Sequence, residues 1–296
     1  MEVIKIKIIE YDSQLYPNLL MNIENPPKQL YAEGNLNLLN SNAISIIGSR
    51  ACSISGINSA KKFARDLAQI GITIISGMAI GIDTAAHTGC LEVGGNTIAV
   101  LGSGLNRIFP KENIQLYHNI IKNNGLIISE YPPDTEANSA RFLERNRIVS
   151  GLSIGVLVIE AAHRSGTSVT AALAKKQKRK VFCIPHELND KHGVGTNKLI
   201  KNGAYLVTSA DDILNEFYFL QNKVSNYEEP EKSKEFDILP SHKYYDVYNA
   251  LIGPPSNVDE LCAKINRSPQ YINTALFTLE LEGYIEKNKY GYQIKV

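Results

Sequence analysis

The sequence predicts an α/β protein with a doubly wound, mostly parallel sheet, followed by a small C-terminal domain of three helices and a hairpin. Short β-branched runs alternate with amphipathic stretches from Asn42 to about Phe219. Such runs are typical of buried parallel strands, because helices cover both faces of a parallel sheet. A charged stretch that is poor in apolar residues, 221–240, then predicts a linker to the C-terminal domain.

The first residues, Met1–Ile9, alternate as a strand does, and we expect residues 1–40 to pack on the main domain as an extension. In the main domain, residues 41–220, strands are predicted at Ala43–Ile47, Thr73–Ile75, Thr97–Val100, Leu126–Ile128, Ile154–Ile159, Val181–Ile184 and Ala204–Val207. Helices are predicted at Ile57–Ile70, Thr84–Val93, Ile114–Asn123 and Ser168–Gln177.

Glycines follow four of these predicted strands, namely Gly48, Gly77, Gly102 with Gly104, and Gly166. The carboxyl ends of parallel strands are where α/β sheets bind ligands, and helix N-termini there offer free N–H groups to anions. A single glycine after a strand often serves only a turn. Four such loops at one rim of the sheet favour a phosphate-binding cleft.

The C-terminal domain, residues 241–296, has the pattern of a winged helix. Helices are predicted at His242–Ile252, at Val258–Ile265 with Asn257 and Glu260 as a capping box, and from Ser268–Pro269 to Gly283. Tyr284–Lys287 and Tyr292–Lys295 are predicted to pair as a hairpin. The third helix contains no Lys or Arg and carries Glu280 and Glu282, which favours protein contact over reading of a DNA groove.

Charge is unevenly distributed along the 296-residue chain, whose formal net charge is only +1. Residues 141–201 hold 12 Lys or Arg against 4 Asp or Glu. This asymmetry indicates a basic face on an otherwise neutral protein. A solvated helix surface around Lys175–Lys180 is the alternative.

The cysteines are scattered, at Cys52, Cys90, Cys183 and Cys262, and fit buried apolar positions in a reducing compartment. The N-terminal segment lacks the pattern of a signal peptide, and no apolar run is long enough to span a bilayer. We therefore expect a cytoplasmic protein with no membrane partner.

The segment Arg145–Gly151 carries the sharpest functional pattern. Arg145 and Arg147 flank Asn146, close after Phe142 and just before the predicted strand at 154–159. Guanidinium groups suit bidentate phosphate contacts, and an aromatic ring offers a surface on which a base stacks. The pattern therefore suggests nucleic acid. An arginine pair bound to Glu144 or Glu160 remains an alternative.

The sequence contains no catalytic, cofactor or metal signature. A P-loop, a complete dinucleotide fingerprint, a nucleophile elbow and metal-ligand spacing are all missing, so we expect no catalytic residue, cofactor or metal. Asp83 and His87 lie four residues apart and could orient a base, but a helix N-cap and a satisfied helix histidine are favoured. Ser165-Gly166-Thr167 could hold an anion at a helix N-terminus.

An ordered series of motifs resembles the DNA-processing protein A family over about Tyr16 to Val207. The motifs are Ile46–Arg50, Ile75–His87, Thr97–Leu105, Ile128–Pro132, Phe142–Ile148, Glu160 with Ser165–Thr167, and Gly195–Ala204. The resemblance implies an extended Rossmann-like fold that binds single-stranded DNA, protects it and loads the RecA recombinase in natural transformation. It also implies a protein that is not an enzyme and a homodimer formed through the Rossmann-like domain.

The resemblance gives the Gly48-Ser49-Arg50 loop and Phe142 to Arg147 a DNA-binding role. Together with the glycine loops, the candidate DNA-binding residues are Gly48, Ser49, Arg50, Gly77, Gly102, Gly104, Phe142, Arg145, Asn146, Arg147, Ser165, Gly166 and Thr167. Ile80 stands where many members carry a basic residue. A preceding helical domain is not expected, because only about forty residues precede Gly48.

Two other functions stay open at this point. The first is a nucleotide-binding or nucleotide-hydrolysing Rossmann enzyme, since Ser165–Thr170 vaguely resembles a loop of such families, although Thr170 replaces their carboxylate. The second is a protein-interaction module that acts through the winged helix.

Overall fold

The chain forms two compact units, Met1–Tyr227 and Glu228–Val296. The computed structural model describes residues 6–162, 165–217, 242–252, 256–288 and 291–294. The predicted linker, 221–240, lies outside the described residues.

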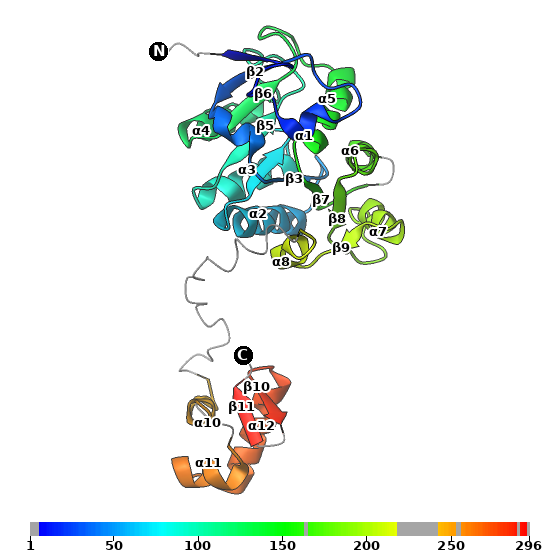
Figure 1. The fold of residues 1–296 in the computed structure, drawn as a ribbon. Coiled ribbons are helices and arrows are strands. Elements are labelled where there is room, and N and C mark those ends of the chain that lie inside the picture. The colour runs from blue at the N-terminus through cyan, green and yellow to red at the C-terminus, as the bar shows by residue number, and fades with distance from the viewer. Residues whose placement is uncertain (1–5, 163–164, 218–241, 253–255, 289–290, 295–296) are drawn as a thin grey trace. The chain divides into compact units, whose positions relative to one another are not determined.

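A nine-stranded sheet organises the first unit, in the order β1-β2-β6-β5-β4-β3-β7-β8-β9 (Figure 1). The strands are β1 (Lys7–Glu10), β2 (Gln29–Gly34), β3 (Ala43–Ile47), β4 (Thr73–Ser76), β5 (Thr97–Val100), β6 (Leu126–Ser129), β7 (Gly155–Val158), β8 (Lys180–Cys183) and β9 (Tyr205–Leu206). From β6 to β9 all neighbours are parallel, while β2 pairs antiparallel with β1 and β6. The predicted mostly parallel α/β sheet is confirmed.

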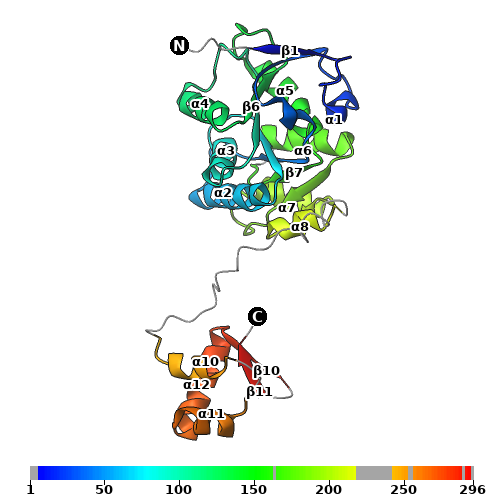
Figure 2. The ribbon, with the colours of Figure 1, turned by 60° about the vertical axis from the view of Figure 1, so that its left-hand side comes forward.

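Helices cover both faces of this sheet, because the buried strands are apolar on both sides. Val156 and Val158 point into the core with α1 (Asn18–Met21), α5 (Ser139–Gly151), α6 (Gly166–Lys176) and α7 (Val194–Lys201). Leu157 and Ile159 point into the opposite core with α2 (Ile54–Gln69), α3 (Ile82–Glu92) and α8 (Ala210–Leu214). α4 (Ile114–Lys122) covers the same side as α2 and α3, opposite α5 and α6 (Figure 2).

The strand order reverses at β3, in the middle of the sheet. The chain runs from β3 outward through β4, β5 and β6 on one side, then returns to β7, beside β3, and continues outward to β9. At such a switch point the loops that follow neighbouring strands diverge and leave a crevice at their carboxyl ends. The loops after β3, β4 and β7 meet there.

Helix α5 is the main departure from the sequence prediction. The sequence pattern sets the segment Arg145–Gly151 beside the start of a strand, but it forms the second half of α5. Strand β2 is also not predicted, since Gln29–Gly34 has no β-branched run. Short helices η1 (Leu36–Asn40) and η2 (Lys111–Asn113) complete the first unit.

The second unit has the predicted three helices and hairpin. It comprises α10 (Tyr245–Ala250), α11 (Val258–Ile265), α12 (Pro269–Leu281), β10 (Ile285–Asn288) and β11 (Gly291–Ile294). The Asn257–Glu260 capping box is confirmed, with both reciprocal hydrogen bonds at 2.9 Å. Ile272, Leu276 and Leu279 of α12 are buried in the unit's core, as predicted. The first helix is shorter than predicted.

The four cysteines are free thiols, and Cys90 and Cys183 are buried, which agrees with the expectation of apolar packing. No helix in the described ranges is long and apolar enough to cross a bilayer.

Candidate functional site

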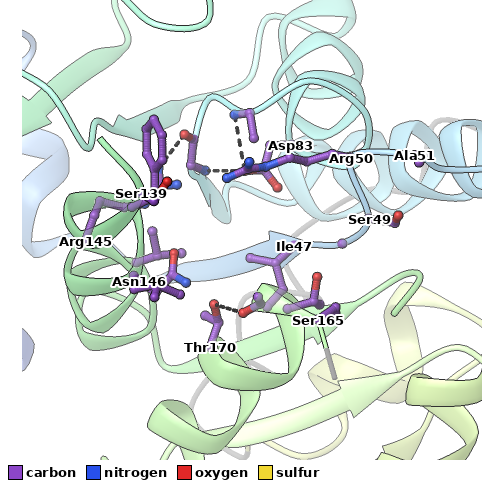
Figure 3. A pocket seen from close by; sticks show the side chains of 18 residues that line it. Ile47, Ser49, Arg50, Ala51, Asp83, Ser139, Arg145, Asn146, Ser165 and Thr170 are labelled. Atoms are coloured by element: carbon purple, nitrogen blue, oxygen red, sulfur yellow. Dashed lines mark hydrogen bonds between the residues drawn. The ribbon is translucent and has the colours of Figure 1, made fainter. Parts of the chain in front are cut away.

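A pocket of about 460 Å³ opens at the switch point of the sheet (Figure 3). Four segments line it. The end of β3 and the loop after it contribute Ile47 to Ala51. The loop after β4 and the first turn of α3 contribute Gly77, Ala79 and Asp83, and the start of α6 contributes Ser165, Gly166, Thr167 and Thr170. The fourth wall is one face of α5, with Ser139, Phe142, Leu143, Arg145, Asn146 and Val149.

The α5 wall is positioned by a helix cap. The side chain of Asn138 accepts a hydrogen bond from the backbone N–H of Arg141 at 2.9 Å, which begins the helix at Ser139. Residues three, four and seven positions apart then share a face. Phe142, Asn146 and Val149 follow this spacing and line the pocket together.

Arg145 forms the floor of the pocket. Its side chain is buried and donates hydrogen bonds to the carbonyl oxygens of Gly77 and Val100, at the ends of β4 and β5. Asp83, also buried, accepts from the backbone N–H groups of Gly77 and Ala79 at 3.2 and 3.3 Å. Burial lowers the pKa of Arg145, and the charge of Asp83 opposes this effect. Burial likewise raises the pKa of Asp83, and the charge of Arg145 opposes it. The two charges offset each other and fix the loop after β4.

Two glycines give the α5 side chains their space. A Cβ at Gly77 would collide with the guanidinium of Arg145. At Gly102, a Cβ would lie 2.6 Å from Cδ1 of Phe142. A side chain at either position would therefore displace Arg145 or Phe142, and Gly102 acts on the pocket through Phe142.

Among the described residues that line the pocket, Arg50 is the exposed cation. Its guanidinium carbon lies 5.4 Å from the centroid of the Phe142 ring, at cation–π distance. Within the described ranges, no carboxylate pairs with Arg50. This guanidinium is therefore available to an anion, in contrast to Arg145.

The start of α6 supplies backbone donors. Its N-cap residue, Ser165, makes no side-chain capping bond, and the first N–H groups of a helix have no partner within the helix. The hydroxyl of Thr170 donates to the carbonyl oxygen of Gly166 at 3.3 Å. The helix start can thus bind an anion opposite Arg50.

Most of the residues predicted from the sequence meet in this pocket. Those that line it are Gly48, Ser49, Arg50, Gly77, Phe142, Arg145, Asn146, Ser165, Gly166 and Thr167. Gly102 supports Phe142 from behind, and Gly104 packs against the carbonyl oxygens of Pro132 and Pro133. Arg147 is not part of the lining.

Arg147 forms an ion pair instead. Its Nη1 and Nη2 donate to Oε1 and Oε2 of Glu130 at 2.9 and 2.6 Å, and both side chains are largely buried. The alternative of a salt bridge therefore holds for Arg147, but with a different carboxylate. Glu144 accepts from Tyr131 at 2.6 Å, and Glu160 accepts from the Ser53 backbone at 3.0 Å.

Asp83 is not the predicted N-cap, whereas His87 is a helix residue as predicted, with one of its two ring nitrogens hydrogen-bonded. The N-cap of α3 is Gly81, and Asp83 lies in the first turn. Nδ1 of His87 lies 2.7 Å from Oγ1 of Thr97, while its buried Nε2 has no partner among the described residues. Burial, with a smaller effect of Arg145, lowers the pKa of His87 to about 3. His87 is therefore a neutral core residue.

The basic run near α6 does not gather at the pocket. Lys176 pairs with Glu24, and Lys180 pairs with Glu216 at 2.7 Å. Lys175 donates to the carbonyl oxygen of Asn202 at 2.7 Å. For these lysines the alternative of a solvated helix surface fits better than a single basic face.

The sequence interpretation misses part of the α5 wall, namely Ser139, Leu143 and Val149. Asn138, a good N-cap residue, followed by this helical spacing is the signal that could have identified them.

Comparison with known proteins agrees with this architecture. Residues 7–218 match the family model described as DNA recombination-mediator protein A. The chain is 38% identical to Protein Smf of Escherichia coli K12 over 290 residues, covering 96% of this chain and 76% of that protein. It is 44% identical to DNA processing protein DprA of Streptococcus pneumoniae over 204 residues, covering 69% of this chain and 72% of that protein.

Two solved structures resemble the first unit. The X-ray structure of DprA from Streptococcus pneumoniae superimposes with a TM-score of 0.69 at 42% identity, covering 72% of this chain and 75% of that one. A structure of DNA processing protein A from Helicobacter pylori, a protein described as having a unique single-stranded DNA binding mode, gives a TM-score of 0.65 at 31% identity. It covers 75% of this chain and 97% of that one. The chain therefore belongs to the DNA recombination-mediator protein A family.

Proposed function

We propose that this protein binds single-stranded DNA in the switch-point pocket, protects the incoming strand and loads the RecA recombinase onto it. The observation that carries the proposal is the exposed Arg50 guanidinium, without an ion pair among the described residues, beside the ring of Phe142. A guanidinium binds phosphate and a flat ring stacks a base, which are the two contacts a single strand needs.

The shape of the site favours a single strand over a duplex. The wall between Arg50 and the start of α6 is concave, and a base reaches Phe142 only when it is unstacked from its neighbours. In the second unit, α12 offers no Lys or Arg to enter a major groove, and it exposes Phe277 and Leu281. The single-stranded DNA binding mode described for the Helicobacter pylori relative supports the binding of a single strand.

We propose no catalytic activity. Within the part of the pocket lining that the structure describes, Asp83 is the sole carboxylate, and it is buried and bonded to backbone N–H groups. Thr170 stands where a related nucleotide-hydrolysing loop has its acid, and its hydroxyl is bound to Gly166. This supports binding over hydrolysis. Incubation with nucleotides and DNA, with and without magnesium, should return them intact, and turnover lost in Asp83→Asn would contradict the proposal.

We further propose a cytoplasmic homodimer that forms through the Rossmann-like domain. Strand β9 ends the sheet, and its Tyr205 and Leu206 are exposed by 41 and 52%. An exposed apolar edge strand tends to pair with a strand of another chain. Val194 at the start of α7, which is 40% exposed, is a further exposed apolar residue of the first unit.

A loading assay tests the proposed function. RecA should displace a single-strand-binding protein from a long oligonucleotide faster when this protein is present, as followed by single-stranded-DNA-dependent ATP hydrolysis of RecA. Arg50→Ala should abolish the acceleration, whereas Arg65→Ala, which removes a half-buried arginine of α2 that pairs with Glu92, should retain it. Equal acceleration by both variants, or none by the wild-type protein, would contradict the proposal.

A further inference from the structure

A second pocket, of about 360 Å³, adjoins the first across Arg50 and Phe142. The two pockets share Arg50, Gly77, Ala79, Phe142 and Arg145. The second has its own wall of Ile80, Phe109, Pro110, Lys111 and Glu112, of which only Ile80 falls within a sequence motif. The side chains of Arg50 and Phe142 therefore form a partition with a pocket on either side.

The wall of the second pocket is largely apolar. Phe109 is 47% exposed and Ile80 is 46% exposed. The ring centroids of Phe109 and Phe142 lie 5.4 Å apart, with 32° between the ring planes. This spacing is that of two rings in direct contact, so a base has no room between them. A base can stack only on the part of the Phe109 ring that solvent reaches.

The charges of this wall distinguish a base from a phosphate. Lys111 is exposed and, in the described ranges, makes no ion pair, while Glu112 brings a carboxylate to the same pocket. A phosphate deep in the pocket would be repelled by Glu112, whereas a neutral base would not. Lys111 and Arg50 can instead bind the phosphates on either side of that base.

We propose that the second pocket binds the base of the next nucleotide of the strand. Phe109 is its stacking surface, Arg50 holds the phosphate between the two nucleotides, and Lys111 neutralises the following phosphate. This inference rests on the proposed function and extends it, because it assigns two adjacent nucleotide subsites separated by the Arg50–Phe142 partition.

Substitutions at Phe109 separate stacking from packing. Phe109→Leu keeps apolar contact with Phe142 but removes the aromatic face, and it should weaken binding of a fluorescent dT12 strand by about 5- to 150-fold, the range of base stacking. Phe109→Tyr keeps the face and should bind within twofold of the wild-type protein. Phe277→Leu, an exposed phenylalanine of α12, is the matched control and should have no effect.

Lys111→Gln tests the phosphate contact. It should weaken binding and lower the slope of log Kd against log salt by about 0.7, the value for one phosphate of a single strand. Lys122→Gln, a lysine at the end of α4 outside both pockets, is its control. Thermal melting of each variant should remain within a few degrees of the wild type.

The outcomes separate this inference from the proposed function. If Phe109→Leu and Lys111→Gln bind dT12 like the wild type while Arg50→Ala does not, the second subsite is wrong and the first stands. If Phe109→Tyr loses as much as Phe109→Leu, stacking is not the cause and the inference is overturned. If the wild-type protein binds no single strand, both proposals fall together.

Discussion

Arg147 and Glu130 form a two-pronged ion pair, in which Nη1–Oε1 and Nη2–Oε2 are 2.9 and 2.6 Å. Arg145, two residues earlier on α5, is buried against the Gly77 and Val100 carbonyl oxygens. Arg145 and Arg147 thus hold α5 to the ends of β4, β5 and β6. Among the described residues that line the pocket, the exposed guanidinium is that of Arg50, from the loop after β3.

Arg147→Ala is therefore expected to affect stability more than DNA binding. Removing one partner of a largely buried pair leaves the carboxylate of Glu130 uncompensated, which costs about 3 kcal/mol. For a domain of this size, thermal melting should fall by roughly 6–12 °C, while affinity for single-stranded DNA of the folded variant stays within threefold. Glu130→Gln should reproduce the loss in differential scanning fluorimetry. A large loss of affinity without a loss of stability would assign Arg147 to the DNA.

Arg50→Ala and Phe142→Leu should weaken single-strand binding in different ways. Losing Arg50 removes a phosphate contact, so affinity should fall roughly tenfold or more and the salt slope should decrease by about 0.7. Losing the Phe142 ring removes stacking worth about 1–3 kcal/mol but no charge, so the slope should stay unchanged. Anisotropy titrations from 50 to 300 mM salt measure both quantities. The same change of slope in both variants would contradict these separate roles.

His87 should make the first unit less stable in acid. Its pKa in the folded protein is about 3, below the ordinary value of 6.5. The unfolded chain therefore binds a proton as pH falls below about 6.5, but the folded chain does not. This group should cost up to about 1.4 kcal/mol of unfolding free energy per pH unit between those two values. His87→Gln should remove that part of the slope in urea unfolding followed from pH 7 to pH 4. If His87→Gln leaves the pH dependence of the unfolding free energy unchanged, His87 takes up its proton in the folded protein as it does in the unfolded chain, which would contradict this prediction.

A chain shortened to residues 1–227, the first compact unit, should keep single-strand affinity within tenfold of the full chain. In the second unit, Lys264 donates to the Ala250 carbonyl oxygen and Ser256 hydroxyl, and Arg267 pairs with Asp246 at 3.4 Å. These cations are engaged within the unit, so their contribution to phosphate binding should be small and screened by salt. A folded truncated protein that loses more than tenfold would show that the winged helix holds DNA.

The buried strands could be predicted from the sequence because their burial is local information. Ala43–Ile47 and Thr97–Val100 are apolar or β-branched runs, and the structure confirms both with the same bounds. Strand β2 has no such run. The segment Gln29–Gly34 forms a strand because it pairs with β6, which lies far along the chain, and local sequence patterns do not reveal such a partner.

Helix α5 was not predicted because the face that it turns to the pocket carries polar residues, which interrupt the helical spacing of apolar residues. Ser139 and Asn146 face the pocket where a core helix would carry apolar residues, and Arg145 is buried. Such local conflicts are expected where a chain builds a binding site. The sequence also could not show that Arg147 pairs with Glu130, because the fold brings α5 close to the residue that follows β6.

The preference between single- and double-stranded DNA tests the central claim most directly. Fluorescence anisotropy with a labelled dT20 strand and a blunt 20-base-pair duplex, at the same salt concentration, compares the two affinities. We expect the single strand to bind at least tenfold more tightly, with little dependence on its sequence, because the pocket requires an unstacked base beside Phe142 and a phosphate at Arg50. Equal affinity for the blunt duplex would contradict this account of the pocket.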